Sequence, residues 1–245
     1  MNIAVGILNW NRDASQTIGS LKGFAGKVIV CSNDVDIAPL LPEVESVKII
    51  PCPENIAKAK NVIINSAREI GATHLFIIED DIAVKDISVF EKYVELMNTF
   101  DIGLTFFGYT NANMVLDGKP NPCIIVKIDQ SGSEICCNRH CCSAVFGIDL
   151  ERNKLMFNEE LLVMEHEEYL QRCTDAGVIP FNGFYIDLPE SWKYFERLPV
   201  KTERVKTVEL AKMDRKMMDD AKVVLHLESS ADKFLAFVKK AVKAS

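Results

Sequence analysis

Thr73-His-Leu-Phe-Ile-Ile-Glu-Asp-Asp-Ile82 is the stretch of sequence that decides the fold. An apolar run ends in three adjacent carboxylates, which predicts a strand buried on both faces of a parallel sheet. Open α/β sheets bind ligands at the carboxyl ends of their strands, and a divalent cation would offset the repulsion among the acids. In an extended chain Glu79 and Asp81 point the same way, so both could reach one metal while Asp80 faces elsewhere. The alternative is a solvated strand-to-loop junction that binds nothing.

Length and composition indicate an ordinary globular protein. The 245 residues can form one large α/β domain or two small ones. A net charge of -7 argues against a general nucleic-acid-binding protein, which needs a basic face. We expect a cytoplasmic protein without a transmembrane segment, because no secretory signal or membrane-length apolar run occurs. Its eight cysteines are therefore expected to be free thiols.

Strands and helices alternate through the first 110 residues, which predicts a mostly parallel, doubly wound sheet. The predicted strands cover 2–8, 27–31, 47–50, the opening stretch and 101–109. The predicted helices cover 13–24, with Asp13 or Ser15 as cap, then 54–70, followed by Gly71, and 86–98, with a capping box over 88–91.

The pattern changes after residue 110. Asp117-Gly118 predicts a hairpin turn between strands at 112–116 and 122–128. Further strands are predicted at 143–149 and 184–187, with a helix at 158–176 between them. The last 45 residues predict two amphipathic helices, so we expect one domain with a helical tail.

Polar clusters follow three of the predicted strands: 9–12, 32–34 and 79–81. Parallel strands would bring all three to one edge of the sheet. The sequence contains no phosphate-binding G-x-x-x-x-G-K-[ST], no G-x-G-x-x-G after the first strand and no G-x-S-x-G elbow. These absences exclude P-loop ATPases, dinucleotide folds of the usual kind and common serine hydrolases.

Four segments, taken in order, resemble the nucleotide-sugar-dependent glycosyltransferases of the GT-A fold, especially those like family 2. Residues 7–12 resemble the first strand of that family and its nucleobase-side loop, and 28–34 resemble the second strand with the Asp that holds the base. Residues 55–61, before 76–81, resemble its "A-R-N" helix and D-x-D strand. Residues 157–160 with 165–177 are similar to its "F-D-E … E-D-x-x-x-x-x-R … G" segment, and the resemblance spans roughly residues 3 to 177.

Three positions depart from the family pattern. Lys60 replaces an Arg and keeps the charge but not the planar fork. Glu79-Asp-Asp81 replaces Asp-x-Asp, which is a chemically mild change. His166 replaces the Asp that is the usual catalytic base of inverting members, which leaves the base open between Glu165 and His166.

The resemblance implies a metal-dependent glycosyltransferase that moves a sugar from a UDP- or GDP-sugar to an acceptor hydroxyl. Its GT-A domain would cover 1–200, with a nucleotide-binding half (1–110) and an acceptor half (111–200), and 201–245 would be a C-terminal helical extension. The donor would be held by Asn9, Asn11, Arg12, Asp34, Lys60 and Asp80. The alternatives are a sugar nucleotidyltransferase and a catalytically inactive nucleotide-binding protein of the same fold.

The chemistry also follows from the residue types. A hard cation such as Mg²⁺ or Mn²⁺ activates a sugar diphosphate, and carboxylates bind it. We expect Glu79 and Asp81 as ligands, and a nearby imidazole, such as that of His166, would favour Mn²⁺. Glu165 or His166 could activate the acceptor hydroxyl. The alternatives are a solvated helix face at 165–168 and turn or cap roles for Asn9, Asn11 and Asp34.

Three other features have two interpretations each. The cysteines and histidine of 136–142 could bind Zn²⁺, but adjacent cysteines lack the usual spacing and favour unpaired thiols. Trp192, Tyr194 and Phe195 could stack on a sugar or pack in the core. The last helix, 230–244, could bind a membrane surface, but docking on the domain or on a second subunit in a homo-oligomer is the favoured interpretation.

Overall fold

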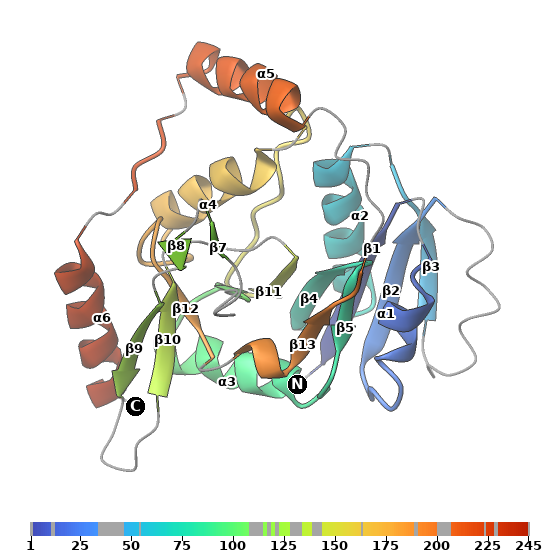
Figure 1. Cartoon of the computed structure of the whole chain (residues 1–245), viewed down its shortest axis with the longest axis horizontal. Helices are drawn as coiled ribbons and strands as arrows, with labels where there is room; N and C mark the ends of the chain where they lie inside the picture. The colour runs from blue at the N-terminus through green and yellow to red at the C-terminus, as the bar shows by residue number, and fades with distance from the viewer. Residues whose placement is uncertain are drawn as a thin grey trace.

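A mixed six-stranded sheet forms the centre of the protein (Figure 1). The structure is a computed structural model, and it describes residues 2–10, 13–33, 47–53, 55–107, 115–116, 119–120, 123–127, 134–138, 144–162, 164–188, 191–199, 207–222, 224–227 and 230–244. In spatial order the sheet contains β3 (Val47–Pro51), β2 (Lys27–Ser32), β1 (Ile3–Asn9), β4 (His74–Glu79), β11 (Val145–Asp149) and β6 (Leu104–Phe106).

The four strands β3, β2, β1 and β4 are parallel, as the sequence predicts, and β11 runs antiparallel to β4 and β6. Asn9 pairs with Ser32, and Leu8 pairs with Glu79, so the polar ends of β1, β2 and β4 meet at one edge of the sheet. All seven residues of β1 are buried. This explains why its sequence is apolar throughout, because helices cover both faces of the sheet.

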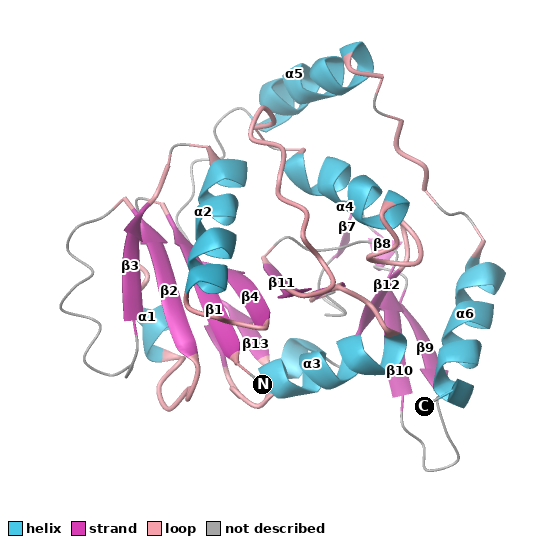
Figure 2. Cartoon of the chain, turned by 180° about the vertical axis from the view of Figure 1, so that it is seen from behind, coloured by secondary structure: helices cyan, strands magenta, loops and turns pink. Residues whose placement is uncertain are grey.

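One face of the sheet is covered by α1 (Ser15–Gly19) and α3 (Val89–Phe100), and the other by α2 (Ile56–Glu69) and α4 (Glu165–Asp175), as Figure 2 shows from behind. The axis of α2 lies close to β1, because a Cβ at Gly6 would overlap the Ile63 side chain. Gly71 follows α2 with a φ of +71°, which confirms the predicted glycine termination.

Several predicted helix boundaries were wrong. The first helix covers only five residues, and neither Asp13 nor Ser15 is its N-cap, because Ala14 occupies that position. At α3, Ser88 has helical backbone angles and makes no side-chain cap bond, so the predicted capping box does not form. The helix predicted over 158–176 begins at Glu165, because side chains hold the residues before it in turns: Asn158 accepts from the Glu160 N–H, and the distant Asp214 accepts from the Leu162 N–H.

The second half adds smaller sheets. The predicted hairpin between 112–116 and 122–128 does not form, because β7 (Val115–Leu116) pairs with β8 (Lys119–Pro120) and the later strand pairs elsewhere. Asp117 and Gly118 lie outside the described residues. A second sheet contains β12 (Tyr185–Asp187), β10 (Glu134–Asn138) and β9 (Cys123–Lys127). The short strand β5 (Ile82–Val84) pairs with β13 (Phe195–Arg197), just after the 3-10 turn η2 (Ser191–Lys193).

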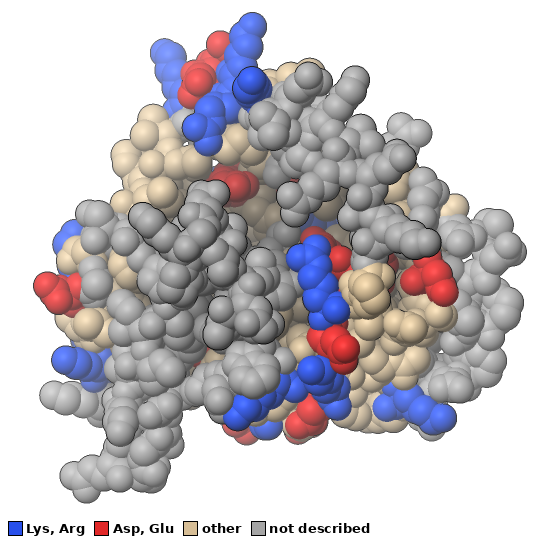
Figure 3. Space-filling model, in the orientation of Figure 1, with Lys and Arg blue, Asp and Glu red and all other residues tan. Residues whose placement is uncertain are grey.

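The tail contains the two predicted helices, α5 (Thr207–Asp220) and α6 (Ala231–Ala244). Phe234 and Val238 of α6 are fully buried in the core beside α3, so this helix docks on its own domain. Charged side chains of both signs are interspersed over the coloured part of the face in Figure 3, α5 included. Among the described residues, no helix is long and apolar enough to cross a membrane.

Candidate active site

The acidic segment at the end of β4 forms a turn. The strand ends at Glu79, Asp80 and Asp81 make the turn, and β5 begins at Ile82. Glu79 and Asp81 would point the same way only if the backbone were extended through residue 81. The turn breaks this alternation of side chains, so each carboxylate takes a different direction. As a result Glu79 and Asp80 border the nearby cavity, and Asp81 is not among its lining residues.

Asp80 connects the acidic turn to the end of β1. Its carboxylate accepts a hydrogen bond from the Trp10 backbone N–H at 3.1 Å, and its carbonyl accepts one from the Thr17 hydroxyl at 2.8 Å. Asp81 is 3% exposed, and its Oδ2 lies 3.2 Å from both Nε and Nη2 of Arg197. Asp80 therefore faces the loop after β1, whereas Asp81 faces β13.

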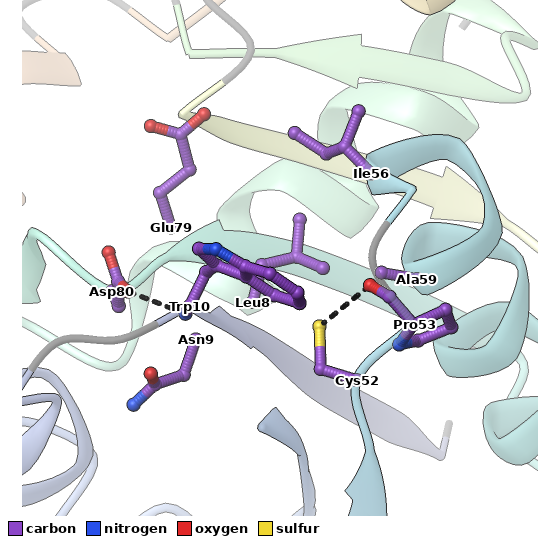
Figure 4. A pocket seen from close by; sticks show the side chains of 9 residues that line it. All are labelled: Leu8, Asn9, Trp10, Cys52, Pro53, Ile56, Ala59, Glu79 and Asp80. Atoms are coloured by element: carbon purple, nitrogen blue, oxygen red, sulfur yellow. Dashed lines mark hydrogen bonds between the residues drawn. The ribbon is translucent and has the colours of Figure 1, made fainter. Parts of the chain in front are cut away.

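A cavity of about 340 Å³ lies between the carboxyl ends of β1 and β4 and the start of α2 (Figure 4). The Trp10 indole extends across it and is 43% exposed. The lining is apolar with a few polar groups at one side, which is typical of small-molecule sites. It consists of Leu8, Asn9, Trp10, Cys52, Pro53, Ile56, Ala59, Glu79 and Asp80.

Only part of the predicted donor site can be placed. Asn9 is fully buried and lines the cavity with Asp80, whereas Asn11, Arg12 and Asp34 lie outside the described residues. Sequence reasoning missed Trp10 and Cys52 as cavity residues. The signal for Trp10 was a large aromatic residue directly after a central strand; Cys52 had no signal beyond the two prolines that flank it.

Lys60, Glu165 and His166 form a buried network on the same face of the sheet as α2. The Lys60 ammonium is fully buried and donates to Glu165 Oε1 at 2.6 Å and to His166 Nε2 at 2.5 Å. Phe146 and Phe157 pack around it, with ring centroids 5.7 and 5.1 Å from Lys60 Nζ. The three predicted residues are therefore brought together, but Lys60 is not among the cavity-lining residues.

His166 is a neutral imidazole in this network. Burial, and next the charge of Lys60, hold the pKa of His166 well below its usual value. Because an ammonium can only donate, His166 Nε2 is the acceptor and the ring proton belongs on Nδ1. Neither His166 Nδ1 nor Glu165 Oε2 has a hydrogen-bond partner among the described residues.

The segment before α4 is fixed by two distant elements. Asn61 of α2 exchanges hydrogen bonds with both backbone groups of Phe157, at 2.8 and 2.9 Å, and donates to Glu159 at 2.9 Å. Asp214 of α5 is fully buried and accepts from the backbone N–H groups of Leu162 and Met164. These contacts hold the start of α4, and with it Glu165 and His166.

Among the described residues, no group of three or more His, Cys, Asp or Glu side chains suited to a metal occurs. Glu79, Asp81 and His166 stay predicted metal ligands. The donor chemistry at the end of β4 still suits a hard cation, since Mg²⁺ is usually bound through one or two carboxylates with water and substrate phosphates.

The remaining candidates have other surroundings. Phe195 is 3% exposed and packs against Phe107 and Tyr93, which confirms core packing for this residue. The Tyr194 hydroxyl accepts a hydrogen bond from Lys92 at 2.9 Å. The Trp192 side chain and the side chains of 136–142 lie outside the described part of the structure.

Comparisons with known proteins identify the fold. A TarS fragment (residues 1–349) from S. aureus has 12% identity and a TM-score of 0.52, with 100% of this chain and 72% of that one covered. The same fragment in complex with UDP has 13% identity and a TM-score of 0.51, with 93% and 67% covered. The mannosyltransferase PcManGT from Pyrobaculum calidifontis, in complex with GDP-Man and Mn²⁺, has 9% identity and a TM-score of 0.56, with 99% and 73% covered.

No protein-family model matches the sequence, and no curated protein matches it significantly. The identities to the solved structures are low, so these similarities concern the fold. This chain has the GT-A fold of the nucleotide-sugar-dependent glycosyltransferases.

Proposed function

We propose that the protein is a metal-dependent glycosyltransferase that moves a sugar from a UDP- or GDP-sugar to an acceptor hydroxyl. The observation that carries the proposal is the cavity at the carboxyl ends of β1 and β4, bordered by Trp10, Glu79 and Asp80 on a GT-A fold. Ligands bind at this edge in open α/β sheets. Solved structures of similar fold contain UDP in one case and GDP-Man with Mn²⁺ in another.

The donor nucleotide would lie in this cavity. The exposed Trp10 indole offers an aromatic face for a base, and Leu8, Pro53 and Ile56 supply apolar walls. Asn9 and Asp80 would provide polar contacts, and Asn11, Arg12 and Asp34 remain predicted donor ligands. Lys60 was predicted to bind the diphosphate, but its full burial against Glu165 supports a different role, as the counter-ion of the α4 network.

Glu79 and Asp81 would hold the cation, which would neutralise charge on the leaving diphosphate. The approach of a cation to Asp81 would be favoured by loosening of its contact with Arg197, a residue whose side chain is 53% exposed. His166 would bind this metal poorly, because its Nε2 already accepts from an ammonium ion.

Of the two proposed bases, Glu165 is the better candidate. The lone pair of His166 Nε2 is engaged by Lys60, and the low pKa of His166 makes it a weak base. Glu165 Oε2 has no partner among the described residues. Glu167, two residues after Glu165, has an exposed side chain and is therefore the natural comparison residue. Partial desolvation and the nearby charge of Glu165 raise the pKa of Glu167.

Thermal unfolding with UDP, GDP, CDP and dTDP, each with and without Mn²⁺, tests the proposal. We expect UDP or GDP to raise the melting temperature, more strongly with Mn²⁺. If no nucleotide stabilised the protein in the presence of metal, the proposal would be overturned. Stabilisation without turnover of any sugar donor would favour an inactive binding protein, and pyrophosphate release from a nucleoside triphosphate and a sugar phosphate would favour a nucleotidyltransferase.

A further inference from the structure

One cysteine in β2 and one directly after β3 lie on the same face of the sheet, next to the cavity. Cys31 in β2 pairs with Ile50 in β3, and Cys52 lies two residues after Ile50. Side chains two residues apart along extended chain lie on the same face, and both cysteines belong to the apolar layer beneath α2. Cys52 N–H donates to Ser32 O at 3.0 Å, so the chain stays beside β2 beyond the end of β3.

The contacts of the two thiols bring them together. Cys31 Sγ donates to the Pro51 carbonyl at 3.7 Å, and the carbon of that carbonyl is bonded to the Cys52 nitrogen. Cys52 Sγ lies between Trp10 and Pro53 in Figure 4 and contacts the Pro53 carbonyl at 3.6 Å. Cys31 is fully buried, whereas Cys52 is half-buried and lines the cavity.

The two thiols differ in reactivity. The neighbouring Cys31 thiol lowers the pKa of the Cys52 thiol, whereas the Cys52 thiol and burial raise the pKa of Cys31. The thiolate is the nucleophile in thiol–disulfide exchange. Cys52 is thus the attacking group, open to the cavity, and Cys31 is a second thiol behind it, shielded from solvent.

We propose that Cys52 and Cys31 form a dithiol modification site, at which a small-molecule disulfide that enters the cavity oxidises the pair to an intramolecular disulfide. Cys52 thiolate attacks one sulfur of the reagent, forms a mixed disulfide and expels one thiolate. Cys31 then attacks the Cys52 sulfur, loses its proton and expels the second thiolate. Two protein thiols are oxidised, one disulfide is reduced to two thiols, and the two protons leave with them.

Oxidation would change the cavity. Bonding to Cys31 would turn the Cys52 sulfur away from Trp10 and join β2 to the exit of β3. The effect does not depend on which ligand the cavity binds, so failure of the proposed glycosyltransferase function would leave this proposal intact.

The test uses the full-length Trp192→Phe protein, in which Trp10 is the remaining tryptophan of the two in the sequence. The protein is incubated with oxidised glutathione, its free thiols are alkylated, and its tryptic peptides are mapped by mass spectrometry. We expect a peptide pair cross-linked through Cys31 and Cys52, with the mass lowered by two hydrogens. Trp10 fluorescence should change at the same rate, because Cys52 borders the same cavity.

Cys31→Ser and Cys52→Ser separate the two roles, with Cys31→Ala as a second variant should the serine protein not fold. Without Cys31 the reaction should stop at a glutathione adduct on Cys52, and without Cys52 the buried Cys31 should stay reduced. Cys173, which is fully buried, is the internal reference, and Cys52 should be alkylated about tenfold faster. Absence of the Cys31–Cys52 cross-link in the folded parent protein, or a Cys52 no more reactive than Cys173, would overturn the proposal.

Discussion

Lys60 and Glu165 are separated by 105 positions in the sequence, yet Lys60 Nζ lies 2.6 Å from Glu165 Oε1, and both side chains are buried. Removing one partner of a buried pair leaves an uncompensated charge in the interior. We therefore expect Lys60→Met to lower the free energy of unfolding by about 3–5 kcal/mol, measured by urea denaturation. The double variant Lys60→Met/Glu165→Leu should recover most of this loss.

The exposed pair Lys48–Glu69 is the control for this prediction. Its atoms are 2.9 Å apart, but the side chains are 41% and 67% exposed. Lys48→Met should cost less than about 1 kcal/mol. Equal costs for Lys48→Met and Lys60→Met would show that burial does not distinguish the two pairs.

The low pKa of His166 makes stability depend on pH. Below the unfolded-state value of about 6.5, the unfolded chain takes up a proton that the folded protein does not. Stability should therefore fall as the pH drops below about 6.5, by at most about 1.4 kcal/mol per pH unit for each such histidine. Burial also lowers the pKa of His74, so two histidines should contribute.

His166→Gln should lower the number of protons taken up on unfolding by about one. The measurement is the change in unfolding free energy between pH 7 and 5. His226→Gln alters an exposed histidine and serves as the control. A slope that is the same in His166→Gln as in the parent would contradict the buried neutral imidazole.

Asp214 should stabilise the entry to α4. Asp214→Ala would leave the Leu162 and Met164 N–H groups without their acceptor, and a lost buried hydrogen-bond partner costs about 1–3 kcal/mol. We expect a loss of this size, with faster hydrogen exchange at both amides. Asp219→Ala, at an exposed position of the same helix, should change stability by about 0.5 kcal/mol or less. Unchanged exchange at residues 162 and 164 would argue against the contact.

Activity separates the two acids at the start of α4. If Glu165 is the base, Glu165→Gln should reduce sugar transfer by about 10²–10⁴-fold, whereas Glu167→Gln should retain most activity. The readout is the initial rate of nucleoside diphosphate release, on variants first shown to be folded by circular dichroism. The reverse ranking would assign the role of base to Glu167.

Periodicity and strand-end chemistry predict much of this molecule, because both depend on local sequence. The apolar runs of β1, β2 and β4 predicted strands buried on both faces of the sheet. The polar residues that follow these runs predicted that the strand ends meet at one edge of the sheet, as the strand pairing shows. The burial of Lys60 could not be predicted, because it depends on Glu165 across 105 positions. The late start of α4 likewise depends on Asp214, whose carboxylate accepts hydrogen bonds from backbone N–H groups 50 to 52 residues earlier in the sequence.

The turn at Asp80 and Asp81 shows the same limit at short range. Three acids in a row predicted a ligand-binding strand end, but alternation could not reveal where the extended backbone stops. Thr17 and Arg197, from opposite ends of the domain sequence, fix the two turn residues. The roles of Glu79 and Asp81 toward a metal therefore remain predictions.

Calorimetric titration of UDP and GDP in the presence of Mn²⁺ tests the central claim most directly, with wild type, Trp10→Ala, Glu79→Gln and the exposed-acid control Asp86→Asn. We expect one of the two nucleotides to bind wild type and Asp86→Asn equally. Loss of base stacking in Trp10→Ala should weaken binding by about tenfold. Glu79→Gln should remove most of the gain in nucleotide affinity that Mn²⁺ provides. Absence of binding to wild type, or binding that none of the cavity variants alters, would contradict a nucleotide-sugar site at the ends of β1 and β4.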